Sequence, residues 1–174
     1  MHQITDLITL FDDTFYQRYN TRLIKGDLEP IYIPADGTIP YHQIIFAHGY
    51  YASALHEIAH WLVAGEKRRK IEDFGYWYCP DGRDEKKQAE FENVEVKPQA
   101  IEWLLSCSAK FKFNVSADNL SGAPSNRVAF QARVHAQVLS LLKNGCNERT
   151  QLFLKVLSDF YKSTWPLNET QFNY

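Results

Sequence analysis

The apolar positions in the first part of the chain switch between helical and extended spacing, which predicts a mixed fold. Residues 3–18 carry apolar side chains at positions 4, 7, 8, 11 and 15, which is the spacing of one helix face. Residues 20–37 are rich in glycine and proline and predict irregular chain around one short strand, 30–34. The apolar run within 41–49, which ends at Gly49, predicts a buried strand.

Later in the chain the spacing is mostly helical. Residues 84–92 have a charged helical pattern, and 96–109 form a second predicted helix with Pro98 in its first turn, where the missing N–H is tolerated. Two further helices are predicted at 125–143 and 148–163, and Asn-Gly and Pro follow their ends. Helices therefore account for most of the predicted structure.

The remaining segments are short. Residues 74–80 predict a strand before an Asp-Gly turn, and 111–115 alternate and predict another. Residues 116–125, rich in Ser, Asn, Gly and Pro, predict a loop on the substrate side. The chain of 174 residues shows no repeat and no break in composition. We therefore predict one α+β domain over 1–174, mostly helical with a small sheet.

Composition narrows the classes of function. A net charge of −2 and a pI near 6.3 argue against a general nucleic-acid binder. The three cysteines are widely spaced and form no CxxC pair, which predicts neither a cysteine zinc site nor a disulfide framework. We see no signal-peptide pattern and no apolar run of the roughly 18 residues that a membrane span needs. We expect a soluble protein of the cytoplasm.

The strongest chemical signal is His56-Glu-Ile-Ala-His60, inside the helical stretch 51–65. Residues i and i+4 share a helix face, so two imidazoles can bind one metal ion. Glu57 projects about 100° away around the helix and could reach a metal-bound water. The neighbouring side chains are apolar, and burying polar groups without partners is unfavourable. The pattern predicts a metal site, and a chance match or a buried histidine pair is the alternative.

A third metal ligand is expected from a carboxylate. Glu102 lies beside the apolar face of the predicted helix 96–109, with few charges near it, so it needs a counter-charge. We therefore predict that Glu102 joins the two histidines at the metal. A surface acid or a salt bridge is the alternative. Glu90, Glu92 and Glu95 compete for the same role, but their sequence setting suggests more solvent.

Three further features are candidates for contacts with a substrate. One histidine follows the predicted strand, and a structural turn histidine is the alternative. A run of four cations follows the metal-site helix and predicts either a solvated helix end or a docking surface for an acidic partner. The aromatic segment before the Asp-Gly turn belongs either to the core or to a pocket. The residues concerned are His48, Lys67, Arg68, Arg69, Lys70, Tyr76 and Trp77.

Residue types alone leave two chemistries and one non-catalytic role open, and the His-Glu-x-x-His motif by itself favours zinc hydrolysis. With zinc, a bound water and Glu57 as general base would hydrolyse a peptide or amide. With ferrous iron, two histidines and one carboxylate would leave positions for oxygen and substrate. A non-catalytic metal-binding module is the third possibility. The sequence contains no His-x-Asp, which supplies the first two ligands of the usual 2-oxoglutarate jelly-roll oxygenases, so nothing predicts that cosubstrate.

Three blocks of the sequence together resemble a known family. They are 54–65 (Ala-Leu-His-Glu-Ile-Ala-His-Trp-Leu-Val-Ala-Gly) with the cation run after it, 74–83 (Phe-Gly-Tyr-Trp-Tyr-Cys-Pro-Asp-Gly-Arg), and 98–103 (Pro-Gln-Ala-Ile-Glu-Trp). The chain resembles the elongation factor P hydroxylases (EpmC) over nearly its whole length. The resemblance implies a zincin-like metal helix, Fe(II), molecular oxygen, and the β-lysylated lysine of elongation factor P as substrate. The metal ligands that it implies are His56, His60 and Glu102.

Overall fold

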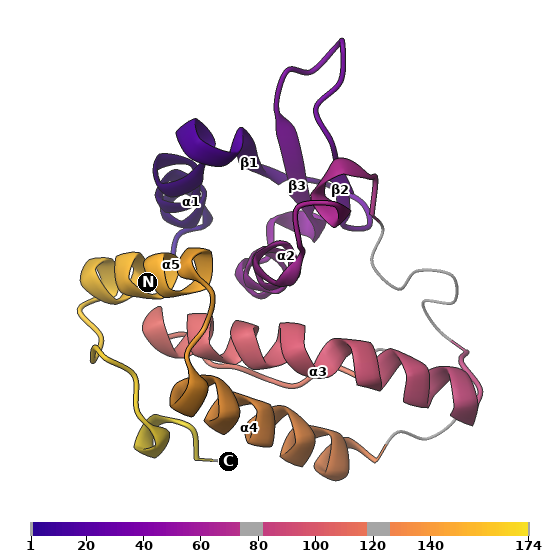
Figure 1. Cartoon of the computed structure of the whole chain (residues 1–174), viewed down its shortest axis with the longest axis vertical. Helices are drawn as coiled ribbons and strands as arrows, with labels where there is room; N and C mark the ends of the chain where they lie inside the picture. Colours follow the sequence, from indigo (N-terminus) through magenta and orange to yellow (C-terminus); the bar gives the residue numbers. More distant parts are fainter. Residues whose placement is uncertain (1, 74–81, 118–125, 174) are drawn as a thin grey trace.

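The computed structural model describes residues 2–73, 82–117 and 126–173. Figure 1 shows a small sheet near one end of the molecule and the helices α3 (Glu85–Ser108) and α4 (Arg127–Asn144) near the other. The helix α2 (Tyr51–Val63) lies between the sheet and α3 and packs against both. The predicted α+β class, with helices in the majority, is confirmed.

The sheet has three strands in the order β1-β3-β2. The central strand β3 (His42–Phe46) runs parallel to β1 (Thr21–Lys25) and antiparallel to β2 (Ile31–Ile33). The prediction of irregular chain before residue 30 was wrong, because it missed β1. Only the first and third residues of β1 are buried, and Arg22 on its other face pairs with Asp12 of the first helix. Such a short, charged edge strand gives little alternating signal.

The first helix, α1 (Ile4–Tyr19), has an aromatic inner face. Phe11 and Phe15 are fully buried, and the ring of Phe15 lies 4.9 Å from that of Trp61 on α2. Both phenylalanines also contact Phe153 of the last helix, α5 (Glu148–Tyr161). The predicted helical spacing is therefore confirmed, and one side of α2 packs on a cluster of aromatic rings.

The sequence predicts two helices between residues 84 and 109, but the structure has one, α3. Pro98 lies inside this helix and not in a first turn. Proline cannot donate to the carbonyl of Val94, one turn earlier, which usually ends or kinks a helix. Val94 is 41% exposed, so solvent reaches the turn that lacks this hydrogen bond. The 24-residue helix thus continues through the proline. Residues before and after Pro98 can therefore lie on the same face of one helix.

The two C-terminal helices are close to their predicted positions, as α4 and α5. No strand forms at 111–115, where the chain runs along α3 without regular structure. The predicted strand 74–80 and most of the predicted loop 116–125 lie outside the described residues. None of the described helices is both long and apolar enough to cross a membrane.

Candidate metal centre

The helix α2 brings the two motif histidines to one face. Its opposite face holds Leu55, Ile58, Ala59 and Leu62, which are fully buried. Burial of this apolar stripe fixes the rotation of the helix, so His56 and His60 must point toward α3. The two imidazole rings are 4.7 Å apart, as expected for positions i and i+4.

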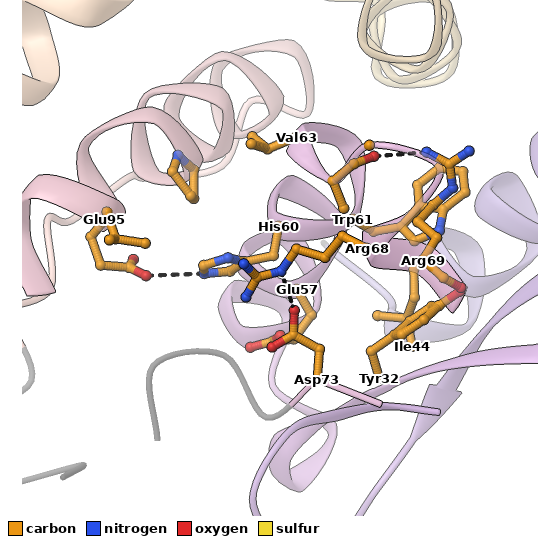
Figure 2. A pocket seen from close by; sticks show the side chains of 14 residues that line it. Tyr32, Ile44, Glu57, His60, Trp61, Val63, Arg68, Arg69, Asp73 and Glu95 are labelled. Atoms are coloured by element: carbon orange, nitrogen blue, oxygen red, sulfur yellow. Dashed lines mark hydrogen bonds and ion pairs between the residues drawn. The ribbon is translucent and has the colours of Figure 1, made fainter. Parts of the chain in front are cut away.

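Among the described residues, His56, His60 and Glu95 form the one group of three ligand-type side chains whose donor atoms lie within 4.8 Å of one another. The two Nε2 atoms are 3.0 Å apart. Glu95 places one carboxylate oxygen 3.2 Å from Nε2 of His60 and the other 3.6 Å from Nε2 of His56. Figure 2 shows Glu95 reaching His60 from α3.

These separations match those of ligands around one metal ion. Ligand atoms bound at about 2.1 Å in tetrahedral or octahedral geometry are roughly 3.0–3.4 Å apart. Two imidazoles and one carboxylate also form the donor set of zinc sites and of mononuclear iron sites with open positions. The three side chains therefore fit a divalent metal ion.

Glu102, the carboxylate expected at the metal, contacts a different atom of the first histidine. Its Oε2 lies 2.8 Å from Nδ1 of His56, on the side of the ring away from the shared cluster. A carboxylate that accepts Nδ1–H fixes the ring orientation and leaves Nε2 free to bind a metal. The geometry therefore favours His56, His60 and Glu95 as the ligand set, with Glu102 behind His56.

Glu95 is also buried, contrary to the expectation that it lies in a more solvated setting. It is 3% exposed, and Gln99 one turn later donates to it over 3.2 Å. Gln99 in turn exchanges two hydrogen bonds with the backbone of Ser116. Glu95 and Glu102 are seven residues apart, two turns along one helix face. Dividing the helix at Pro98 concealed this relation, which the spacing alone could have shown.

The electrostatics of the cluster favour a bound cation. Burial lowers the pKa of His56, but the charges of Glu102, Glu95 and Glu57 outweigh this effect and hold the pKa well above its usual range. Burial raises the pKa of Glu95, yet the charge of His60 and His56 lowers it more, to about 2. Three carboxylates around two imidazoles are thus stabilised by added positive charge, either protons or a metal ion.

A pocket of about 200 Å³ opens beside these ligands and lies between α2, α3, β2 and the segment that follows α2. Figure 2 shows His60 and Glu57 from α2 and Glu95 from α3 facing it. Burial raises the pKa of Glu57, although the charges of His56 and His60 act against the rise. Glu57 is therefore a carboxylate partly withdrawn from water, next to the ligand cluster. The other lining residues are Tyr32, Ile44, Trp61, Val63, Ala64, Gly65, Arg68, Arg69, Asp73, Val94 and Pro98.

The expected substrate contacts divide into three groups. Arg68 and Arg69 line the pocket, whereas Lys67 and Lys70 are exposed beside it, and Lys70 pairs with Glu66. The cation run lies beyond the end of α2, with Arg68–Lys70 in a short 3₁₀ turn. His48 is exposed and does not line the pocket. Tyr76 and Trp77 lie outside the described residues.

Arg149 of α5 is a structural residue that the sequence did not reveal. It is 9% exposed and donates to the carbonyl oxygens of Trp61, Leu62 and Ala64 over 2.7–3.2 Å. These carbonyls belong to the end of α2, where a helix lacks its own donors. The guanidinium also lies 4.4 Å from the ring centroid of Trp61. Arg149 therefore caps the helix that carries both histidines.

Two comparisons with known proteins identify the family of this chain. The model of the family described as elongation factor P hydroxylase matches residues 10–172. A curated protein of Haemophilus influenzae, named elongation factor P lysine hydroxylase, is 51% identical over 172 residues. The match covers 99% of this chain and 97% of that protein. The chain therefore belongs to the elongation factor P hydroxylase family.

Proposed function

We propose that this chain is a cytoplasmic non-haem iron hydroxylase that adds one oxygen atom to the β-lysylated lysine of elongation factor P. The observation that carries the proposal is the convergence of His56, His60 and Glu95 on one point beside a pocket. The substrate is proposed from membership of the family and from the name of the H. influenzae relative. The proposal replaces Glu102 by Glu95 as third ligand.

Fe(II) bound by His56, His60 and Glu95 would leave positions open and would activate molecular oxygen, the oxidant, for conversion of C–H to C–OH. In the overall reaction one oxygen atom would enter the product and the other would leave as water, with two electrons from a reductant and two protons. The chain itself contributes position and environment. Glu102 accepts Nδ1–H of His56 and orients that ligand. Apolar walls such as Ile44 and Pro98 exclude water from the reacting side chain.

Glu57 and the two exposed lysines of the cation run have separate proposed roles. Glu57 lines the pocket and its pKa is raised, so it can hold or pass a proton close to the metal ligands. Lys67 and Lys70 are exposed beside the pocket, and these two lysines would attract an acidic protein substrate. Arg68 and Arg69 line the pocket instead.

The deciding experiment measures the intact mass of β-lysylated elongation factor P after incubation with the protein, Fe(II), a reductant and air. We expect a gain of one oxygen atom that is lost without iron and in His56→Ala. His48→Asn is the matched histidine variant, because His48 is exposed outside the pocket and asparagine tolerates its positive φ of 52°. Unchanged mass with wild-type protein would refute the hydroxylase.

The same Glu57 also fits the general base of a zinc peptidase, since it belongs to a His-Glu-x-x-His helix and lines the pocket. This alternative predicts cleavage of peptides or amides by the zinc-loaded protein. A peptide library that stays intact with zinc, together with the mass gain with iron, would reject it.

A further inference from the structure

The pocket wall includes a further polar pair, formed by Arg68 and Asp73 from the segment that joins α2 to α3. Nε of Arg68 donates to Oδ2 of Asp73 over 2.6 Å. Figure 2 shows this pair facing the same pocket as His60 and Glu57. A side chain that enters the pocket to reach the metal ligands would meet this ion pair.

Asp73 is the fixed member of the pair. Its backbone N–H and C=O exchange hydrogen bonds of 3.0 and 2.9 Å with Tyr32 on β2, as in a short antiparallel bridge. The hydroxyl of Tyr32 also donates to the carbonyl of Arg69 over 2.8 Å. The Asp73 side chain is 23% exposed, whereas that of Arg68 is 56% exposed. The carboxylate is therefore held at the pocket wall, and its arginine partner extends toward solvent.

The Arg68–Asp73 pair is weak enough to exchange partners. An ion pair in which one side chain is more than half exposed contributes little net stability, because water solvates both charges when the pair opens. A cation delivered deeper into the pocket would meet Asp73 with less competing water. The other lining arginine, Arg69, is engaged elsewhere, since it donates to the carbonyl of Ala64 over 2.7 Å and lies over the rings of Tyr19 and Trp61.

We infer that Asp73 is the specificity residue that binds an ammonium group of the β-lysyl extension, and that Arg68 occupies its place when no substrate is bound. This inference rests on the proposed function. The β-lysyl group adds two ammonium groups beyond the lysine that is hydroxylated, so a pocket that selects the modified side chain is expected to hold a carboxylate in addition to the metal ligands. Asp73 is such a carboxylate and lies in the same pocket as His60.

The test compares Asp73→Asn with Arg68→Gln in binding elongation factor P. Both variants break the ion pair, but only Asp73→Asn, which keeps the size of the side chain, removes the negative charge. The protein is loaded with Zn(II) and kept free of oxygen, so that binding is measured by calorimetry without turnover. The two ligands are elongation factor P with a β-lysylated lysine and with an acetylated lysine, which carries no ammonium at that position.

We expect Asp73→Asn to weaken binding of the lysylated protein about tenfold or more, since a charge-assisted hydrogen bond is lost. Arg68→Gln should leave this affinity unchanged or increase it, and neither variant should alter binding of the acetylated protein. In turnover, Asp73→Asn should raise KM while kcat at saturation stays within about twofold, because uniform binding is lost.

Three results would overturn the inference. Equal weakening by Asp73→Asn and Arg68→Gln would make the ion pair a structural feature only. An equal loss of affinity in Asp73→Asn for the lysylated and the acetylated protein would show that Asp73 does not bind the ammonium group. Wild-type affinity in Asp73→Asn would exclude a role in binding while the mass gain still supported the hydroxylase. A wild-type protein that neither binds nor oxidises lysylated elongation factor P would instead refute the proposed function itself.

Discussion

The assignment of Glu95 as metal ligand and Glu102 as a hydrogen-bond partner predicts that the two carboxylates respond differently to the same change. Glu95→Gln removes the negative charge of a carboxylate whose two oxygens lie 3.2 Å from Nε2 of His60 and 3.6 Å from Nε2 of His56. Glu102→Gln removes an acceptor 2.8 Å from Nδ1 of His56, one imidazole ring away from the metal position. Both substitutions keep the size of the side chain, so differences in packing are small.

The expected magnitudes follow from these positions. Loss of a carboxylate behind a ligating histidine weakens metal binding about 10–100-fold, which corresponds to roughly 1.4–2.7 kcal/mol. Glu95→Gln should exceed that range, because a metal–oxygen bond and a full charge are lost together. Glu92→Gln is the matched control, since Glu92 lies one turn from Glu95 on α3 and ion-pairs with Arg133 over 3.5 Å. Its metal affinity should stay within about threefold of wild type.

The assay is a competition titration of Co(II) against a chromophoric chelator, with circular dichroism to confirm that each variant is folded. The absorption of bound Co(II) also reports the number of ligands. An affinity loss in Glu102→Gln that equals or exceeds that in Glu95→Gln would refute the reasoning. That result would restore Glu102 as the third ligand, as the sequence and the family resemblance suggested.

Three other perturbations have defined outcomes. Arg149→Met should lower the free energy of unfolding by about 3 kcal/mol in urea titrations, because three carbonyls at the end of α2 lose a buried cationic donor; a loss below about 0.5 kcal/mol would contradict the cap. Glu57→Gln should retain metal but lose turnover, and normal turnover would make Glu57 structural. Lys67→Glu with Lys70→Glu should raise KM for elongation factor P at low salt, and the difference should shrink as salt screens the charges; an unchanged KM at low salt would reject the docking surface.

Helical periodicity predicted the helices of this fold well where one face is apolar. The inner face of α1, with Leu7, Phe11 and Phe15, is fully buried and spaced at one helix repeat. Such faces can be recognised in a sequence, because burial of apolar area determines which face of the helix packs against the core. The edge strand β1 was missed because only two of its five positions are buried, and Arg22 and Lys25 are among the others.

The face of α3 that builds the site was harder to recognise, because it is polar and buried at the same time. Gln88, Glu95, Gln99 and Glu102 are spaced 7, 4 and 3 residues apart and are all less than 9% exposed. If polar residues are assumed to be exposed, this face of the helix is wrongly predicted to face solvent. The histidines could be predicted from their motif, and Glu102 was expected beside them. Glu95 was missed because α3 was divided at Pro98, which lies between the two carboxylates.

This buried polar face implies that metal binding and folding are coupled. Glu57, Glu95 and Glu102 surround two histidines at the contact of α2 with α3, and without a cation their mutual repulsion opposes that contact. A metal that binds only the folded chain adds about 2.7 kcal/mol at a free concentration of 100 times Kd. For a chain of this size that gain raises Tm by roughly 5–10 °C. Calorimetry with Zn(II) should show the rise in wild type and not in His56→Ala, and an equal rise in both would place the bound metal elsewhere.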